Sequence, residues 1–420
     1  MISDAGITPS SGPSSNDLDR LVHPDEARAI VLSHARALPT ETIVLREAAW
    51  RVLAEDLHAA EDHPPFRAAT MDGYAVVSAD GSPWREVIGV QTPGHLVDVE
   101  VTPGTAVRIT TGAPVPRGAD AVVRVENTEP AEDHVIVHQT EVAPGESIRP
   151  VGFDVRRGDL LLSAGTRLGP AELGLVAGLG INPISVRRRP RVSILSTGDE
   201  LVEPGEPLGP GQIRDSNRFS LLAALQAEGT DVVWAGKGAD ERGALETLVL
   251  ERIADSDAVI TSGGVSMGET DFIKAILGDL ATVHFRRVFM KPGKPFNFAT
   301  SGQALIFGLP GNPVSALVGF ELFVRPALAT LSGRADIDRP RVPVTLAHDT
   351  PPTDRIEYQR AIIRVDSEGR LVASTTGNQS SSRLVSLVGA NALLVIPPRD
   401  TMYQAGERVE ALLLGPPSDR

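Results

Sequence analysis

The sequence predicts an α/β multidomain protein whose central domain is a doubly wound, mostly parallel sheet covered by helices. Apolar strand-like runs alternate with amphipathic helix-like segments between residues 191 and 331. Before this region, between residues 63 and 165, proline and glycine recur among short alternating runs, which is typical of β-rich domains. After residue 333 short strand-like runs return between prolines, which predicts a small C-terminal β domain.

The composition limits the class of protein. A length of 420 residues and a hydrophobic content of 41% indicate several folded domains with buried cores. The net charge is −14, from 40 basic and 54 acidic residues, and this argues against a nucleic-acid partner because such proteins carry a basic excess. The absence of cysteine excludes disulfides, thiolate catalysis and cysteine-ligated zinc.

The N-terminal segment carries no recognisable targeting signal. Residues 1–18 are polar and rich in serine, glycine and proline, so we expect them to be disordered and not to act as a signal peptide. No charge-free apolar run reaches the roughly 18 residues that a membrane span needs. We therefore expect a soluble, cytoplasmic protein without a membrane partner.

The helices and strands are expected in the following order. A helix opens at Pro24, because proline suits the first turn and the acids after it complement the helix dipole. A second short helix is expected over residues 47–57, and a third begins near Pro170. The central domain is expected to contain strands at residues 192–196, 231–235, 258–262, 283–288 and 304–309, and helices at residues 217–228, 240–254, 270–280 and 312–331.

Polar loops follow three of the predicted parallel strands. They are Thr197-Gly198-Asp199-Glu200, Ser262-Gly263-Gly264 and Pro310-Gly311-Asn312-Pro313. In doubly wound sheets, ligands bind beyond the carboxyl ends of the strands. The sequence therefore predicts a binding site at the edge where these three loops leave the sheet.

Several residues near this edge suit an anionic, phosphate-bearing ligand. The two glycines after Ser262 expose backbone N–H groups, which bind oxyanions, although a tight turn has the same pattern. Lys291 and Lys294 bracket a proline-glycine pair that fixes the direction of both lysines. Asn312 is a candidate N-cap with Pro313 in the first turn, so helix N–H groups face the same edge.

Carboxylates also occur in the loops around the predicted edge. Asp271 begins a predicted helix, where it either complements the helix dipole or acts as a ligand for Mg²⁺ together with substrate phosphate. Asp199, Glu200 and Asp240 are further candidates. In the β-rich region, the loops around Asp72 and Thr111 have the composition of ordinary turns.

Taken together, these motifs resemble the molybdopterin molybdenumtransferase family, to which the C-terminal region of gephyrin belongs. The motifs that carry the resemblance are Met71-Asp72-Gly73-Tyr74-Ala75, Thr111-Gly112-Ala113-Pro114-Val115-Pro116, Thr197-Gly198-Asp199-Glu200-Leu201, Ser262-Gly263-Gly264-Val265-Ser266, Gly268-Glu269-Thr270-Asp271, Lys291-Pro292-Gly293-Lys294-Pro295 and Leu309-Pro310-Gly311-Asn312-Pro313-Val314-Ser315. The resemblance extends from about residue 23 to the C-terminus.

The resemblance implies a fold, a reaction and an assembly. It implies a molybdopterin-binding α/β domain at residues 189–335, a β-rich domain at 61–150, a helical part at 19–60 plus 151–188, and a C-terminal β-barrel at 336–420. It implies insertion of molybdate into adenylylated molybdopterin with release of AMP, in the presence of Mg²⁺. It further implies a homodimer whose active cleft is built from both subunits.

The resemblance also assigns roles to residues of this chain. It implies catalytic roles for Glu200, Asp271, Lys291, Lys294, Asp240 and Asp154, and Mg²⁺ ligation by Asp271 and Glu200. It implies contacts with the substrate for Asp72, Thr111, Ser262, Gly263, Gly264, Ser266, Arg287, Pro310, Gly311, Asn312, Pro313 and Arg360.

Two positions depart from the family pattern, and two other functions stay open. Many bacterial members have an aspartate in the run that here reads Phe66-Arg67-Ala68-Ala69-Thr70, and Arg287 stands where some members have lysine. A molybdopterin adenylyltransferase has a similar α/β domain but lacks the large β-rich domain and the lysine segment. A non-catalytic scaffold with the same fold is the second alternative.

Overall fold

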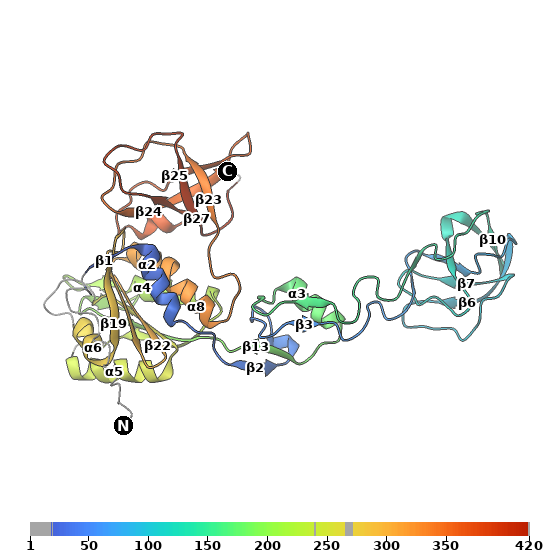
Figure 1. Ribbon diagram of the computed structural model, residues 1–420, viewed down its shortest axis with the longest axis horizontal. Helices are drawn as coiled ribbons and strands as arrows, with labels where there is room; N and C mark the ends of the chain where they lie inside the picture. Colours follow the sequence, from blue (N-terminus) through green and yellow to red (C-terminus); the bar gives the residue numbers. More distant parts are fainter. Residues whose placement is uncertain (1–17, 19, 239–240, 265–271, 419–420) are drawn as a thin grey trace, which may run out of the picture.

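The computed structural model describes residues 18, 20–238, 241–264 and 272–418. Figure 1 shows an elongated molecule with the α/β part and the C-terminal sheet at one end, a small part containing α3 in the middle, and a six-stranded sheet at the far end. Apart from residue 18, the segment predicted to be disordered lies outside the described residues.

The central sheet has seven strands in the order β1-β19-β21-β22-β18-β14-β17. Their bounds are β1 Leu21–Val22, β14 Arg191–Ser196, β17 Asp231–Lys237, β18 Ala258–Ser262, β19 Thr282–Val288, β21 Pro295–Ser301 and β22 Ala304–Leu309. Neighbouring strands are parallel, except that β21 runs antiparallel to both β19 and β22. The predicted doubly wound, mostly parallel fold is confirmed.

Helices cover both faces of this sheet. They are α2 Pro24–His34, α4 Ser216–Ala227, α5 Arg242–Asp255, α6 Phe272–Leu280, and α7 Pro313–Gly319, which continues through a π-helical turn at Phe320–Val324 into α8 Arg325–Leu331. One core joins the sheet to α2, α4 and α7–α8, and a second joins it to α5 and α6. In the described chain one helix, Pro313–Leu331, is long and apolar enough to cross a membrane, but most of it is buried in the first core.

The first helix packs on the α/β sheet, whereas the sequence grouped it with the middle part. Its N-terminus is as expected, with Pro24 in the first turn and the His23 ring accepting a hydrogen bond from the Asp25 N–H at 3.3 Å. The preceding strand β1 pairs with β19, and Ala27 and Val31 are fully buried in the α/β core. Apolar burial along this helix therefore determines its place.

The middle part is a small body with two short ladders and one helix. Strand β2 (Thr40–Ile43) pairs with β13 (Ile184–Arg187), β3 (Leu57–His58) pairs with β12 (Leu160–Leu162), and α3 spans Pro170–Gly178. The predicted helix at residues 47–57 is wrong, since only a 3₁₀ turn at Leu45–Glu47 forms. Trp50 has a positive φ of 63°, which is incompatible with a continuing right-handed helix. Leu53 then donates its N–H to the Thr166 carbonyl, so this segment is extended and pairs with a distant part of the chain.

The β-rich part contains a six-stranded sheet in the order β8-β5-β7-β6-β10-β9. Its strands are β5 Gly73–Val76, β6 Trp84–Gln91, β7 Thr105–Ile109, β8 Ala121–Arg124, β9 Thr128–Ala131 and β10 His134–Val137, with a 3₁₀ turn at Val125–Asn127. A neck toward the middle part is formed by β4 (Ala68–Ala69) paired with β11 (Ile148–Arg149).

The C-terminal sheet closes on itself, which confirms the predicted barrel. Its strands are β23 Arg341–Leu346, β24 Ile356–Val365, β25 Leu371–Thr375, β26 Ala392–Ile396 and β27 Arg408–Leu413, with a 3₁₀ turn at Leu384–Leu387. Closure follows because β24 pairs with β26 as well as with β25. A short strand of the α/β part, β20 (Met290–Lys291), joins this sheet by pairing with β24.

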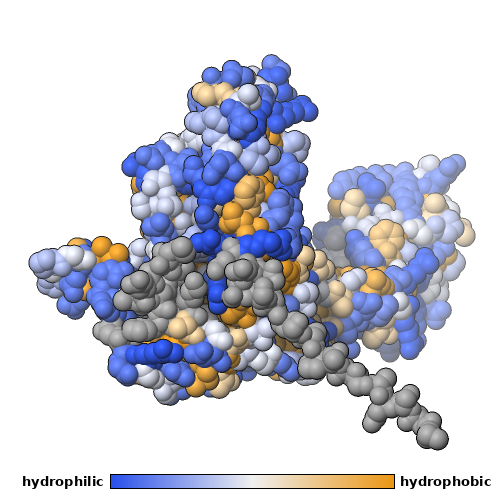
Figure 2. All heavy atoms as spheres, turned by 60° about the vertical axis from the view of Figure 1, so that its left-hand side comes forward, coloured by the Kyte–Doolittle hydropathy of each residue, from blue (hydrophilic) through white to orange (hydrophobic). Residues whose placement is uncertain are grey.

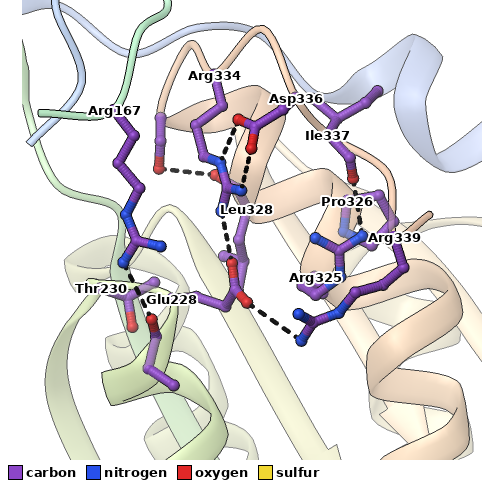
Figure 3. Close-up of polar contacts among 12 residues, drawn as sticks. Arg167, Glu228, Thr230, Arg325, Pro326, Leu328, Arg334, Asp336, Ile337 and Arg339 are labelled. Atoms are coloured by element: carbon purple, nitrogen blue, oxygen red, sulfur yellow. Dashed lines mark hydrogen bonds and ion pairs between the residues drawn. The ribbon is translucent and has the colours of Figure 1, made fainter. Parts of the chain in front are cut away.

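A buried ion-pair network joins three of these parts. Glu228, just after α4, lies 2.8 Å from the guanidinium of Arg334 and 3.7 Å from that of Arg339, both on the segment that leads to the barrel (Figure 3). Arg167 of the middle part donates to the Ala227 carbonyl at 3.3 Å in the same place. The network therefore fixes where the middle part and the barrel leave the α/β part.

Candidate active site

Three loops leave the sheet side by side at its carboxyl edge. The register places Ser196 beside Ser262, and Ser262 beside Leu309. The Thr197 N–H donates to the Ser262 carbonyl at 3.0 Å, and the Gly263 N–H donates to the Leu309 carbonyl at 3.1 Å. The alternation of strands and helices predicted this convergence, since the carboxyl ends of parallel strands share one edge.

The glycine loop (residues 262–264) brings its backbone close to the neighbouring strand end. Gly263 and Gly264 have φ values of +86° and +67°, a region that favours glycine. A Cβ added at Gly263 would lie 2.5 Å from the Thr197 carbonyl oxygen. Both space and conformation therefore require glycine at position 263.

Glu200 carries an exposed carboxylate at the first of the three strand ends. Gly198 has a φ of +139°, and a Cβ there would lie 2.5 Å from Oε2 of Glu200, so the carboxylate folds back over this glycine. The Ile213 N–H donates to the Glu200 carbonyl at 2.8 Å, in the short ladder of β15 (Leu201–Val202) with β16 (Ile213–Arg214). The backbone of Glu200 is thus held while its side chain faces solvent.

The lysine loop (residues 291–295) lies between the α/β part and the barrel. Lys291 is on β20, opposite Glu357 of β24, and the Lys291 Nζ is 3.2 Å from Oε1 of Glu357. Gly293 has a φ of +101° and packs against the Met290 side chain. Strongly hydrophilic residues lie at the level where the barrel meets the α/β part on the face shown in Figure 2.

The proline loop (residues 310–313) contacts the barrel. Pro313 is in the first turn of α7 as predicted, but Asn312 makes no side-chain cap hydrogen bond. Its Nδ2 donates instead to Oγ of Ser381 at 3.0 Å, and the Val314 N–H donates to the Ser381 carbonyl at 3.1 Å. A barrel loop is therefore hydrogen-bonded directly to the proline loop.

Arg360 holds the barrel loop around Ser381 through buried hydrogen bonds. Its side chain is fully buried, with Nε donating to Oγ of Ser386 at 3.1 Å and Nη2 to the Ser380 carbonyl at 3.2 Å, while Nη1 has no partner among the described residues. Burial lowers the pKa of the Arg360 guanidinium to about 10. The arginine stays charged at neutral pH and retains one unused donor.

Three predicted site residues lie in the arm formed by the middle and β-rich parts, away from the strand-end loops of the same chain (Figure 1). Asp72 accepts hydrogen bonds from the backbone and the hydroxyl of Thr111, at 2.7 and 2.8 Å, and these bonds lower the pKa of the Asp72 carboxyl. Asp154 lies 3.4 Å from the guanidinium of Arg149. Arg67 donates to the Ala119 carbonyl at 3.0 Å.

The remaining predicted residues are placed only in part. Asp240, Ser266 and Asp271 lie outside the described residues. Arg287 is on β19, where it pairs with Pro295 at the end of the lysine loop. Within residues 20–238, 241–264 and 272–418 there is no group of three histidine, aspartate or glutamate side chains that could hold a metal ion.

Sequence reasoning missed two residues that contact the site. Asn217, in the first turn of α4, donates to Ser262 and to Gly311, and Glu357 pairs with Lys291. Both are polar residues with side chains that are almost entirely buried. The sequence offered one indication, a polar residue inside an otherwise apolar helix or strand pattern. This pattern does not show which loops the residue contacts.

Comparisons with known proteins agree along the whole chain. Family models match for the MoeA N-terminal region (domain I and II) at residues 22–180, the probable molybdopterin binding domain at 193–330, and the MoeA C-terminal region (domain IV) at 343–414. The molybdopterin molybdenumtransferase of Haemophilus influenzae is 38% identical over 391 residues, covering 92% of this chain and 96% of that protein. Gephyrin of Dictyostelium discoideum is 36% identical, covering 93% of this chain and 62% of that protein.

A solved structure shows the same architecture. The molybdopterin biosynthesis moeA protein of Pyrococcus horikoshii OT3 matches with a TM-score of 0.78 and 30% identity, covering 94% of this chain and 100% of that one. The fold and the strand-end site thus define a multidomain protein built around a molybdopterin-binding α/β domain. The chain belongs to the molybdopterin molybdenumtransferase family.

Proposed function

We propose that this protein is a molybdopterin molybdenumtransferase, which inserts molybdate into adenylylated molybdopterin and releases AMP in molybdenum cofactor biosynthesis. The observation that carries the proposal is that the glycine loop, the proline loop and the lysine loop meet at one edge of the sheet, where the start of β21 pairs with the ends of β19 and β22. Family membership and relatives that bear this name support the same reaction.

The loops suit distinct parts of such a substrate. The pyrophosphate of the adenylate lies against the glycine loop at Gly264, because the Gly263 N–H already donates to the Leu309 carbonyl and the backbone N–H groups of glycine-rich turns bind oxyanions. Lys291 and Lys294, or Arg287, hold molybdate and offset the negative charge that develops as the phosphoanhydride bond to AMP breaks. The donor that Arg360 leaves unused lies beside the barrel loop that contacts Asn312.

The carboxylate of Glu200 suits a bound Mg²⁺. Mg²⁺ usually keeps several waters and takes one or two carboxylates together with substrate phosphates, so a cage of three acids is not needed. Glu200 offers an exposed carboxylate at the strand ends, and we propose that Glu200 and Asp271 hold the ion. When bound, Mg²⁺ neutralises charge on the pyrophosphate oxygens.

We further propose a homodimer in which each cleft uses the arm of the partner subunit. Asp72, Thr111 and Asp154 lie on the arm, so the sequence-predicted set is completed by a second copy. Asp240 and Ser266 stay in the proposed set. The predicted domain limits also stay, except that β1 and α2 belong with the α/β part. The acidic composition supports a protein without nucleic-acid or membrane partners, and we propose a cytoplasmic location.

A non-catalytic scaffold is the alternative that the gephyrin relative suggests. The retained Glu200, Asp271, Lys291 and Lys294 favour catalysis. The adenylyltransferase alternative is not favoured, because a large β-rich part and the lysine loop are present.

The test is AMP release from adenylylated molybdopterin with Mg²⁺, with and without molybdate. We expect molybdate-dependent release that Asp271→Asn abolishes, and that Glu200→Gln lowers by roughly two orders of magnitude, while both variants stay folded. Normal turnover by Asp271→Asn would refute the assignment of this carboxylate. A folded wild-type protein that releases no AMP would favour the scaffold.

A further inference from the structure

The first turn of α4 concentrates buried polar side chains at the strand-end edge. Asp215 caps the helix by accepting from the Arg218 N–H at 3.1 Å, and Asn217 follows within the same turn. All three side chains belong to residues that are less than a tenth exposed. Buried polar groups are costly unless they are hydrogen-bonded, so their contacts at this edge have a structural or functional reason.

One amide group of this turn joins two of the three strand-end loops. Nδ2 of Asn217 donates to Oγ of Ser262 at 2.8 Å and to the Gly311 carbonyl at 2.8 Å. Ser262 begins the glycine loop and Gly311 lies in the proline loop. The two hydrogens of a single amide nitrogen therefore set the separation of the two loops.

The same turn is also connected to the third loop. The Asp215 N–H donates to the Val202 carbonyl at 3.0 Å, and the Ile213 N–H donates to the Glu200 carbonyl at 2.8 Å. The lysine loop, in contrast, is held by Glu357 and β24 of the barrel. The start of α4 thus holds the loops assigned to the adenylate, while the barrel holds the lysine assigned to molybdate.

We propose that Asn217 is a positioning residue that holds the glycine loop and the proline loop in a fixed arrangement against each other, and thereby sets the affinity for the adenylate. This inference rests on the proposed function, because the adenylate is assigned to the glycine loop there and the family resemblance implies substrate contacts for the proline loop. A substitution at Asn217 then weakens binding of the adenylate and leaves binding of molybdate unchanged. If Asn217 only stabilised the fold, its substitution would lower the fraction of active protein and would change neither the KM for the adenylate nor the KM for molybdate.

The experiment compares Asn217→Ala and Asn217→Asp with wild type in the AMP-release assay, varying each substrate in turn. Asn217→Asp keeps the volume but removes the donor and places a carboxylate against the Gly311 carbonyl. We expect KM for adenylylated molybdopterin to rise about tenfold in both variants, since one lost hydrogen-bonding group or a small misplacement has this effect. KM for molybdate should stay within about twofold. Gln226→Ala, an exposed position on the same helix, is the matched control and should behave as wild type.

The variants separate the inference from the proposed function. Isothermal calorimetry with AMP gives a second readout, in which the Kd should rise about tenfold for Asn217→Asp. An unchanged adenylate KM in Asn217→Asp, or a fall in kcat alone, overturns the positioning role although the transferase function stands. If wild type neither binds nor releases AMP, the proposed function fails and the inference fails with it.

Discussion

The ammonium group of Lys291 lies 3.2 Å from Oε1 of Glu357, and this ion pair links the lysine loop to the C-terminal barrel. Glu357 is almost completely buried and also accepts a hydrogen bond from Nε2 of Gln359 at 3.1 Å. Lys291 is about half exposed. The barrel therefore directs this lysine while leaving part of its ammonium group available to an anion.

Replacing Lys291 should affect stability as well as function. In Lys291→Met the Gln359 amide is the one hydrogen-bond donor left to the buried Glu357 among the described residues, so the free energy of unfolding should fall by about 1–2 kcal/mol. Lys294 has no ion-pair partner among the described residues, and Lys294→Met should cost less than about 0.5 kcal/mol. Urea denaturation at pH 7 measures both. Equal losses in the two variants would show that the ion pair does not stabilise the fold.

The network around Glu228 gives a second stability prediction (Figure 3). In Glu228→Gln, Arg334 and Arg339 lose a shared buried carboxylate, although each keeps another acidic partner, so we expect a loss of about 2–3 kcal/mol. Asp336→Asn removes a mostly exposed partner of Arg334 and should cost less than about 1 kcal/mol. Thermal unfolding of the two variants provides the comparison. A smaller loss for Glu228→Gln than for Asp336→Asn would contradict the network's role.

Much of the fold could be predicted, because hydrophobic periodicity marks buried strands and helices directly. The predicted strand at residues 258–262 coincides with β18, and the helix opening at Pro24 is present. Strand β21 was missed, since it follows directly on the lysine loop and places the polar Asn297 between two buried phenylalanines. The predicted helix at residues 47–57 was wrong because partners distant in sequence, such as Thr166, form a ladder there.

The sequence predicts the individual loops of the site, but not the contacts that join them. The glycine loop and the proline loop were predictable from residue types after apolar strands. The contacts of Asn217 and Glu357 were not, because each joins elements that are separated by dozens of residues in sequence. Asp72 and Asp154 were predicted from their motifs, but the sequence does not show that they lie on the arm, away from the strand-end loops of the same chain.

His284 predicts a pH dependence of stability. Burial, and to a lesser degree the neighbouring His34 ring at 4.0 Å, lower the pKa of His284 to about 4, and its Nε2 lies 2.9 Å from the Thr300 hydroxyl. Between pH 6.5 and pH 4 the unfolded chain binds a proton that the folded chain does not, so the free energy of unfolding falls as the pH falls. The contribution is fully present above pH 6.5. Because His284 is only partly buried, the loss between pH 7 and pH 4 should be about 1–2 kcal/mol.

The measurement is urea denaturation of wild type and His284→Asn at pH 7 and pH 5. The variant should lose less stability over this interval than wild type. His95→Asn, at an exposed position, serves as the control and should follow wild type. Identical pH dependence in wild type and His284→Asn would exclude this group as the cause.

The proposed cleft shared between two subunits predicts that inactive variants complement each other. Glu200 lies at the strand ends and Asp154 lies on the arm, so a dimeric cleft takes one from each subunit. Homodimers of Glu200→Gln or of Asp154→Asn should be nearly inactive. A heterodimer of the two, purified through two different tags, contains one doubly altered cleft and one intact cleft. Its activity should reach about half that of wild type.

The matched control is a heterodimer of Glu200→Gln with Asp271→Asn. Both changes lie in the sequence of the α/β part, so each cleft keeps one defect and the heterodimer should stay inactive. Activity in this control would mean that Glu200 and Asp271 act in different clefts. An inactive Glu200→Gln/Asp154→Asn heterodimer would mean instead that each cleft draws both residues from one chain, which requires the arm to fold back onto its own α/β part.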